Sequence, residues 1–207
     1  MQWYITLTCA LAAYAIGSIP FGYLAGRLNG MDIRQHGSGN IGATNVFRVL
    51  GARWGVPVFL LDFLKGLIAV LAARGVFPGS EVAALAGAVG VVLGHNYPVW
   101  LQFRGGKGIA SSAGVLIGLI PLSAIVAIVV WVVVMKITRY VSLASLVAAA
   151  VLPVATLAQT LTSDQVGWGV FGFTLLAAAM AFWRHRGNIV RLRDGTEPKM
   201  GQKNSEA

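Results

Sequence analysis

Long apolar segments alternate with short polar segments along the whole chain. The apolar runs cover residues 3–25, 55–74, 82–101, 109–135, 141–161 and 166–183. Most of these runs match the roughly 20 residues that a helix needs to cross a bilayer. The pattern therefore predicts an all-α, polytopic integral membrane protein, with no recurring period of the kind that marks a repeat protein. We treat residues 1–207 as a single membrane-embedded domain.

The 109–135 run can form one long tilted helix or two shorter helices that meet near Pro121, because proline disrupts helical hydrogen bonding. The distribution of basic residues decides between these alternatives. With two helices and the N-terminus outside, every Lys and Arg except Lys65 and Arg74 falls in an inner segment. Basic residues favour the cytoplasmic side of a membrane. We therefore expect about seven transmembrane helices, with the N-terminus outside and the C-terminus in the cytoplasm.

Composition agrees with a membrane protein and excludes several other classes. The chain is 57% hydrophobic and only 11% charged, with a mean hydropathy of +0.73. Its net charge of +9 resides mostly in short loops between apolar runs, where membrane topology and anionic lipid explain it. We therefore expect membrane lipids as partners and no nucleic acid. A single cysteine, Cys9, allows neither an intramolecular disulfide nor a cysteine metal cluster.

The segment LQFRGGKGIASS, residues 101–112, has the densest combination of glycine and positive charge. Its candidate binding residues are Arg104, Gly105, Gly106, Lys107 and Gly108. Glycines can adopt positive φ and let backbone N–H groups converge on an anion, which the two cations would also attract. The helix expected to follow would point its N-terminus at the same anion. A Walker A loop is excluded, because that motif requires glycine in place of Leu101. The segment predicts a phosphate site.

The first inner loop, HGSGNIGATNVFR, is rich in glycine, amide and hydroxyl groups. Its candidates are Ser38, Asn40, Gly42, Asn45 and Arg48. Neutral hydrogen-bonding groups and an arginine that can bind an oxyanion through two N–H groups predict a second polar site. The alternative is that the serine and the two asparagines only cap turns and helix ends.

Two further inner segments carry candidate residues. In RHRGNIVRLRDG, His185 and Asn188 share a helical face beside four arginines. The alternative for this segment is a basic tail that binds the membrane surface. Ser142 and Ser145 lie on one face at the start of the 141–161 run, where serines more often bond to a carbonyl of their own helix.

Two charged residues fall inside an apolar run. Asp62 and Lys65 are three residues apart on one helical face. An unpaired charge at membrane depth costs about 2.5 to 3.5 kcal/mol, so we expect a structural ion pair, with a supporting role at the site as the alternative. For His95, near the inner end of the 82–101 run, orientation of the neighbouring loop is as well supported as catalysis.

The predicted topology brings all the polar inner loops to one side of the membrane. The sequence has no acidic cluster that would hold Mg²⁺ and no G-x-S-x-G motif of a hydrolase. These features favour group transfer from an activated substrate that carries phosphate, without a metal or another cofactor. The competing class is a transporter of phosphate-bearing lipids. Such proteins often contain internal repeats with paired broken helices, and none is visible in this sequence.

Three motifs together make the sequence more specific. GSGNIGATNVFR, FRGGKGIA and HRGNIVRL, in this order, resemble those of the bacterial acyl-phosphate:glycerol-3-phosphate acyltransferase family, and the resemblance spans nearly the whole chain. It implies a seven-helix protein of the bacterial cytoplasmic (inner) membrane with its site facing the cytoplasm. The implied reaction moves a fatty acyl group from acyl phosphate to the 1-hydroxyl of glycerol 3-phosphate, giving lysophosphatidic acid and phosphate.

The resemblance also implies roles for individual residues. Those expected to act in catalysis are Ser38, Arg48, Lys107, His185 and Asn188; the other candidates above would bind substrate. The family is expected to have a serine after the fifth span, where Ser145 fits best by its spacing from Lys107 and Ser142 remains an alternative. An acyl phosphate has a good leaving group, so we expect direct attack without a covalent intermediate. The proton of the attacking hydroxyl would pass to His185 or to a phosphate oxygen of the substrate.

Overall fold

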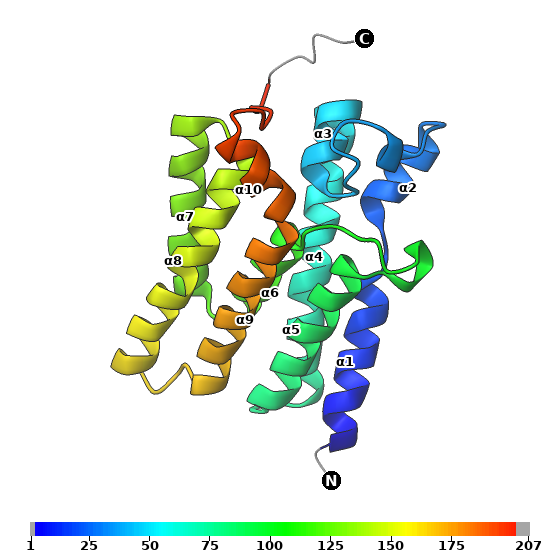
Figure 1. Cartoon of the computed structure of the whole chain (residues 1–207). Helices are drawn as coiled ribbons and strands as arrows, with labels where there is room; N and C mark the ends of the chain where they lie inside the picture. The colour runs from blue at the N-terminus through cyan, green and yellow to red at the C-terminus, as the bar shows by residue number, and fades with distance from the viewer. Residues whose placement is uncertain (1–2, 202–207) are drawn as a thin grey trace.

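The computed structural model describes residues 3–201, and over that range the secondary structure is entirely helical. The helices are α1 (Trp3–Gly17), α2 (Phe21–Leu28), η1 (Ile33–Gln35), α3 (Ala43–Leu50), α4 (Ala52–Val76), α5 (Glu81–Asn96), η2 (Val99–Leu101), α6 (Ile109–Leu119), α7 (Pro121–Thr138), α8 (Val141–Thr162), α9 (Trp168–Arg184) and α10 (Arg186–Arg193). The long helices lie side by side, with the start of α1 at one end of the bundle and α10 at the other (Figure 1). The predicted all-α membrane fold is confirmed.

Five segments are long and apolar enough to cross a membrane: Trp3–Leu28, Ala52–Val76, Glu81–Leu101, Pro121–Thr138 and Val141–Thr162. The remaining apolar helices, α6 and α9, have 11 and 17 residues. At about 1.5 Å per residue, α6 alone is much shorter than a hydrocarbon core of about 30 Å. The count of seven spans and their orientation therefore stay predictions. Both chain termini lie outside the described residues.

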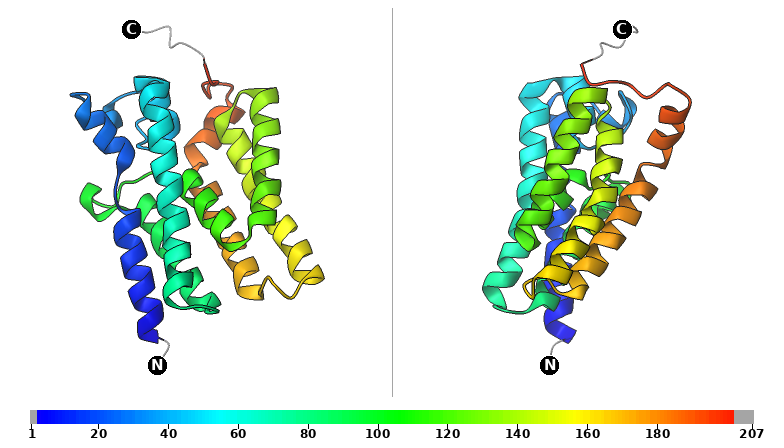
Figure 2. Two further views of the ribbon diagram at one scale, coloured as in Figure 1. Left: turned by 180° about the vertical axis from the view of Figure 1, so that it is seen from behind. Right: turned by 90° about the vertical axis from the view of Figure 1, so that its left-hand side faces the viewer.

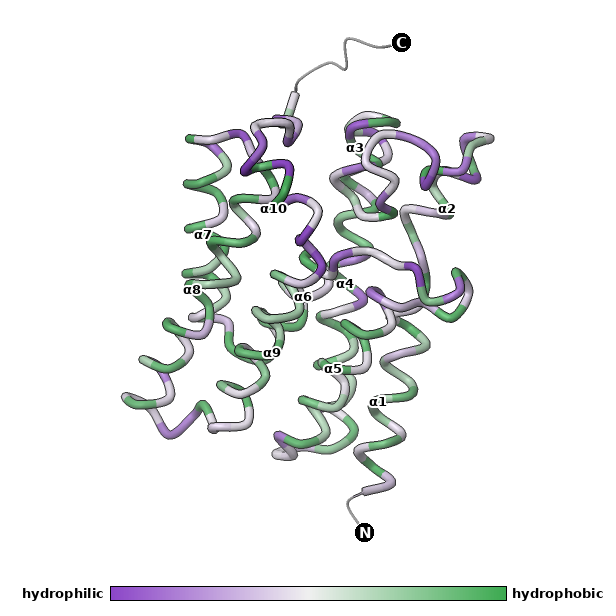
Figure 3. The backbone as a smooth tube through the Cα atoms, viewed as in Figure 1, coloured by the Kyte–Doolittle hydropathy of each residue, from purple (hydrophilic) through white to green (hydrophobic). Residues whose placement is uncertain are grey.

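Hydropathy divides the bundle into two zones. Hydrophilic segments gather at the α3 and α10 end and along the connection that follows α5, whereas the opposite ends of the long helices are mainly hydrophobic (Figure 3). Large apolar side chains such as Leu64 and Leu71 of α4 and Val129 of α7 are exposed on the outside of the bundle. Lipid can cover such surfaces, because all the backbone hydrogen bonds of a helix are internal.

Two of the predicted spans are interrupted. The 3–25 run forms two helices, α1 and α2, because Pro20 lacks an N–H group and ends the helical ladder at residues 18–20. The 82–101 run is helical only to Asn96 and continues as the short 3₁₀ helix η2. The expectation of two helices in the 109–135 run is confirmed, since α6 and α7 are separated at Ile120.

Glycines allow two pairs of helices to pack backbone against backbone. A Cβ atom at Gly90 of α5 would overlap the carbonyl of Ala10 in α1, and one at Gly114 of α6 would overlap the carbonyl of Phe63 in α4. Small residues permit this close approach of helices in membranes. The two contacts hold α5 against α1 and α6 against α4, and these two helices flank the loop that carries Lys107.

Arg74 has a structural role. Its Nη1 donates to the carbonyl of Gly118 at 2.6 Å, and its Nη2 donates to the carbonyl of Leu119 at 3.2 Å. The last carbonyls of a helix have no partner within that helix. Arg74, the basic residue expected on the outer side, therefore caps the C-terminal end of α6.

We predict that Gly90→Ala destabilises the protein, because the added methyl group separates α1 from α5. Overpacking typically costs about 1 to 3 kcal/mol, which for a chain of this size lowers the Tm by roughly 2 to 10 °C. The matched control is Gly172→Ala in α9, where a Cβ meets nothing within 4 Å. Thermal unfolding in detergent, followed by tryptophan fluorescence, measures both variants, and equal shifts would contradict the proposed packing.

Candidate functional site

Three polar segments that are far apart in the sequence come near one another between the middle of the bundle and its α3 and α10 end. They are the segment from η1 to α3, the connection from η2 to α6, and the junction of α9 with α10 (Figure 1). The charges of Arg48, Arg184, Arg191 and Glu197 all act on the ammonium group of Lys107. The structure therefore brings Arg48, Lys107 and the third motif together, as the predicted topology requires.

A chain of hydrogen bonds joins the second and third motifs. Lys107 Nζ donates to Asn188 Oδ1, and Asn188 Nδ2 donates to Glu197 Oε1 at 2.6 Å. Arg191 Nε donates to the other carboxylate oxygen, Glu197 Oε2, at 2.7 Å. Because Glu197 accepts from the amide nitrogen of Asn188, the amide oxygen faces Lys107.

Glu197 is a site residue that the sequence analysis missed. Burial opposes its ionisation, but the nearby Ser142 hydroxyl and hydrogen bonds from Asn188 and Arg191 lower the pKa of this carboxyl below its ordinary value. The tail that carries it crosses from α10 toward the ends of α7 and α8 (Figure 2). There the Met200 N–H donates to the Arg139 carbonyl at 2.8 Å. The only sequence signal was an acidic residue in a strongly basic tail.

Lys107 titrates close to physiological pH. Burial lowers the pKa of its ammonium group to about 8, an effect that the negative charge of Glu197 opposes and nearby arginines reinforce. The charged form is therefore present at neutral pH and is lost as the pH rises through about 8. A partly dehydrated ammonium group without a carboxylate bonded directly to it is suited to binding an anion.

His185 is neutral at physiological pH. Its ring nitrogen Nδ1 lies 2.7 Å from the carbonyl of Ala181, which can only accept a hydrogen bond, so Nδ1 carries the proton and Nε2 a lone pair. Burial, followed by the charge of Lys107, lowers the pKa of the imidazole to about 4. In this state Nε2 accepts a hydrogen bond from a hydroxyl group and cannot donate one to a phosphate oxygen.

The connection between η2 and α6, residues 102–108, is called the glycine loop below. It differs from the prediction in one important way. Of its three glycines only Gly108 has positive φ, at 81°. The Gly105 N–H donates to the Asn96 carbonyl and the Gly106 N–H to the His95 carbonyl, both at 3.1 Å. The expectation that these two N–H groups converge on an anion is therefore wrong. They instead satisfy carbonyls at the end of α5.

Arg184 also holds the glycine loop, by donating to the carbonyls of Gly105 and Gly106. Its Nη2 donates to the carbonyl of Gly105 at 2.8 Å and to that of Gly106 at 2.7 Å. Its Nε also donates to the Gly106 carbonyl, at 3.0 Å. What the loop offers an anion is the side chain of Lys107 and the first turn of α6, whose N–H groups lack partners within the helix.

Most polar groups of the first motif hold that loop in shape. Asn45 Oδ1 accepts from the Ser38 N–H at 2.8 Å, and its Nδ2 donates to the His36 carbonyl at 3.0 Å. Asn40 Oδ1 accepts from the N–H of Gly42, the residue that precedes α3, at 2.8 Å. The capping alternative therefore holds for both asparagines. The side chain of Ser38 is exposed, and Arg48 is half-buried beside the other cations.

The structure separates the two candidate serines. Ser145 Oγ donates to the Val141 carbonyl at 2.8 Å and accepts from Trp131 Nε1 at 3.1 Å. Ser142 lies beside Glu197 in the site. The rotation of α8 thus directs Ser145 toward α7 and Ser142 toward Glu197. Contact of either serine with substrate stays a prediction.

Arg104 is exposed and borders an adjoining open cavity of about 530 Å³. The other residues around this cavity are Asp32, Arg34, Gln35, Gly39, Ile41, Phe103, Gly105 and Arg184. A cavity of this size accommodates a small ligand. Arg184 and Gly105 connect it with the loop that carries Lys107.

Comparisons with known proteins agree on one family. The family model described as glycerol-3-phosphate acyltransferase matches residues 7–195. A glycerol-3-phosphate acyltransferase of Desulforamulus reducens is 44% identical, and the match covers 96% of each chain. One from Gloeobacter violaceus is 46% identical over 97% of this chain and 98% of its own.

A solved structure is also similar over most of the chain. It is the crystal structure of PlsY, an integral membrane glycerol 3-phosphate acyltransferase, in its glycerol 3-phosphate form, with a TM-score of 0.87 and 40% identity over 95% of this chain and 96% of that one. The lysophosphatidic acid form of PlsY gives a TM-score of 0.84 at the same identity, over 95% of each chain.

We predict that Glu197→Gln lowers the Tm at neutral pH. A glutamine can accept from only one of Asn188 and Arg191 and presents its NH₂ group to the other donor. Loss of a hydrogen bond to a charged group costs about 1.5 to 3 kcal/mol of stability, which lowers the Tm by roughly 3 to 10 °C. Because the folded-state pKa of Glu197 is lowered, the difference from the wild type is complete at neutral pH and disappears as acid protonates the wild-type carboxyl.

The matched control is Asp194→Asn in the same tail. Asp194 pairs with Arg193 at an exposed position, and such pairs contribute little. Thermal unfolding across a pH series measures both variants. A loss in Asp194→Asn as large as that in Glu197→Gln would show that the buried network does not stabilise the tail.

Proposed function

The chain belongs to the glycerol-3-phosphate acyltransferase family, and from that premise we propose the particular reaction that it catalyses. A fatty acyl group passes from acyl phosphate to the 1-hydroxyl of glycerol 3-phosphate, giving lysophosphatidic acid and inorganic phosphate. This is an acyl-phosphate:glycerol-3-phosphate O-acyltransferase reaction, and its product is a phospholipid precursor. The relatives named above carry the name of the acceptor, glycerol 3-phosphate, and the acyl phosphate donor is our inference.

One observation carries this proposal: three basic residues from three separate motifs, Arg48, Lys107 and Arg191, lie close enough for their charges to repel one another. A neutral His185 lies beside them. Both proposed substrates carry phosphate, and a partly buried group of cations binds phosphate well. The neutral Nε2 of His185 suits a hydroxyl of glycerol rather than its phosphate.

The transfer proceeds by direct attack. The oxygen of the 1-hydroxyl bonds to the carbonyl carbon of the acyl phosphate, and the bond between that carbon and the phosphate oxygen breaks. Inorganic phosphate leaves with the electron pair of that bond. The cations and the start of α6 stabilise the negative charge that develops on the phosphate and on the carbonyl oxygen.

The proton of the hydroxyl passes to a phosphate oxygen of the donor. With a pKa of about 4, His185 is a weak base at neutral pH, whereas an efficient general base has a pKa near the working pH. The low pKa supports proton transfer to the substrate. His185 then orients the hydroxyl by accepting its hydrogen bond at Nε2.

The proposed location is the bacterial cytoplasmic membrane, with the chain as one membrane domain and the polar end of the bundle facing the cytoplasm. The distribution of basic residues supports this orientation. A site at that surface receives water-soluble glycerol 3-phosphate from the cytoplasm, while the fatty chains of the donor and product remain among membrane lipids.

We predict that the purified protein forms labelled lysophosphatidic acid from labelled glycerol 3-phosphate with palmitoyl phosphate and not with palmitoyl-CoA. Arg48→Ala loses activity by roughly 10- to 150-fold, the equivalent of about 1.5 to 3 kcal/mol for a hydrogen bond to a charged group. The matched control is Arg53→Ala, which removes the same charge at an exposed position of α4 and keeps wild-type activity. Use of palmitoyl-CoA alone would contradict the proposed donor.

We also predict that kcat/KM for glycerol 3-phosphate falls as the pH rises through about 8, because Lys107 loses its charge there. This parameter reports ionisations of the free enzyme. The control is Lys107→Arg, whose guanidinium group stays charged throughout the accessible range. This variant is less active but should lack the decline near pH 8; an unchanged decline would exclude Lys107 as its cause.

A further inference from the structure

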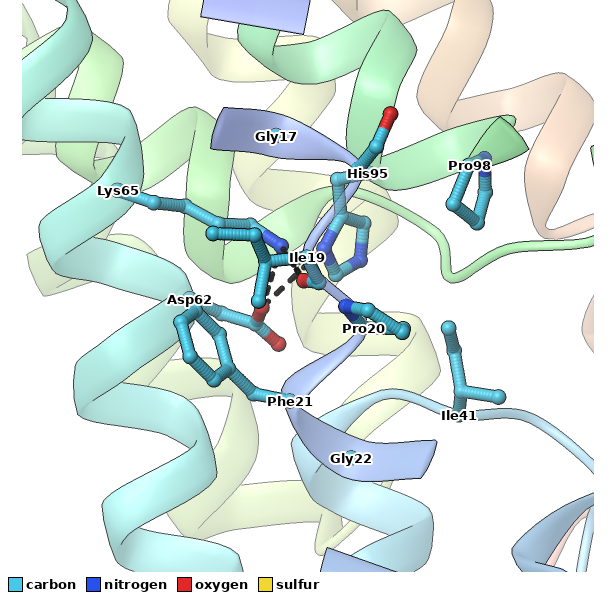
Figure 4. A pocket seen from close by; sticks show the side chains of 11 residues that line it. Gly17, Ile19, Pro20, Phe21, Gly22, Ile41, Asp62, Lys65, His95 and Pro98 are labelled. Atoms are coloured by element: carbon cyan, nitrogen blue, oxygen red, sulfur yellow. Dashed lines mark hydrogen bonds and ion pairs between the residues drawn. The ribbon is translucent and has the colours of Figure 1, made fainter. Parts of the chain in front are cut away.

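A buried charged cluster lies beneath the glycine loop. Lys65 Nζ is 2.8 Å from Asp62 Oδ1, and His95 Nδ1 is 3.3 Å from the same oxygen. All three side chains are at most 6% exposed, and they point toward one another from α4 and α5 (Figure 4). The predicted ion pair between Asp62 and Lys65 is confirmed, and His95 is a third member that the sequence analysis did not connect to it.

Lys65 accounts for the structural part of this cluster. Its ammonium group donates to the carbonyl of Ile19 at 3.0 Å, at the break between α1 and α2. It also lies 5.4 Å from the centre of the Phe21 ring. Asp62 neutralises Lys65, so the pair holds the broken first span against α4. This role does not require the imidazole of His95.

His95 connects the cluster to the loop. Its carbonyl accepts the Gly106 N–H at 3.1 Å, and its ring lies directly against the same glycine. A methyl group at Gly106 would overlap Nε2, and the other two nearest atoms, at 3.0 Å, also belong to the His95 ring. Arg184 holds the Gly106 carbonyl from the opposite side. The residue that follows is Lys107.

We infer that Asp62 and His95 are positioning residues for Lys107, an inference that rests on the proposed function of that lysine in binding phosphate. The Asp62 carboxylate fixes the plane of the imidazole, and the imidazole supports Gly106 and so sets where the Lys107 side chain begins. Gly105 and Gly106 have no side chains to anchor the loop. Its position therefore depends on the backbone hydrogen bonds, Arg184 and the ring beneath it.

The test variant is His95→Asn. The asparagine amide can occupy the place of Nδ1 beside Asp62, but it lacks the part of the ring that supports Gly106. The loop then loosens and water reaches Lys107, so the lowered pKa of its ammonium group rises toward the ordinary value. KM for glycerol 3-phosphate rises roughly tenfold, a change equivalent to about 1.4 kcal/mol, with a smaller change in kcat.

Competitive labelling of Lys107 with acetic anhydride across a pH series, read by mass spectrometry, measures its titration without an activity assay. The charged and titratable groups facing Lys107 are Arg48, Arg184, Arg191, Glu197 and His185, and no test variant alters them. The matched control is Thr156→Val in α8, which removes a buried hydroxyl that donates to the Leu152 carbonyl of the same helix. Asp62→Asn, where it folds, should shift the titration of Lys107 in the same direction as His95→Asn.

An upward shift of the Lys107 titration in His95→Asn, absent in Thr156→Val, supports the positioning role. An unchanged titration and KM in His95→Asn, even with a lower Tm, would overturn it and leave His95 a packing residue. Failure of the proposed function would be seen in a different measurement: the wild-type protein would form no lysophosphatidic acid from palmitoyl phosphate. The labelling of Lys107 would still report whether His95 affects its titration.

Discussion

Helix ends inside a membrane protein leave carbonyl groups that only the protein can satisfy. This chain has several such ends near the middle of the bundle. Lys65 binds the Ile19 carbonyl where α1 breaks, and Arg74 binds the last carbonyls of α6. At the end of α5, the N–H groups of Gly105 and Gly106 serve the same purpose. The site is built on these capped ends.

This constraint divides the basic residues into two groups. Lys65, Arg74 and Arg184 are used to bind backbone carbonyls and hold elements in place. Arg48 and Lys107 lie where they can attract an anion, with Glu197 limiting their mutual repulsion. Gly105 and Gly106 also have a structural role. Because they lack side chains, the loop can lie against the end of α5, and Lys107 follows directly in the chain.

The sequence predicted the apolar helices and the convergence of Arg48, Lys107, His185 and Asn188, because hydrophobic length and charge distribution are local properties of the chain. It could not specify contacts that depend on helix rotation or on long-range folding. The rotation of α8 places Ser142 beside Glu197 and turns Ser145 toward Trp131 of α7. Glu197 reaches the site only because the tail folds back toward α7 and α8. Spacing in the sequence specifies neither event.

The most direct measurement of the central claim is phosphate release from palmitoyl phosphate by the detergent-purified protein, with and without glycerol 3-phosphate, beside folded Lys107→Ala. A single site for both substrates predicts that release requires glycerol 3-phosphate, equals the lysophosphatidic acid formed, and is lost in the variant. Release by the wild type that ignores glycerol 3-phosphate, or a folded Lys107→Ala as active as the wild type, would contradict the account.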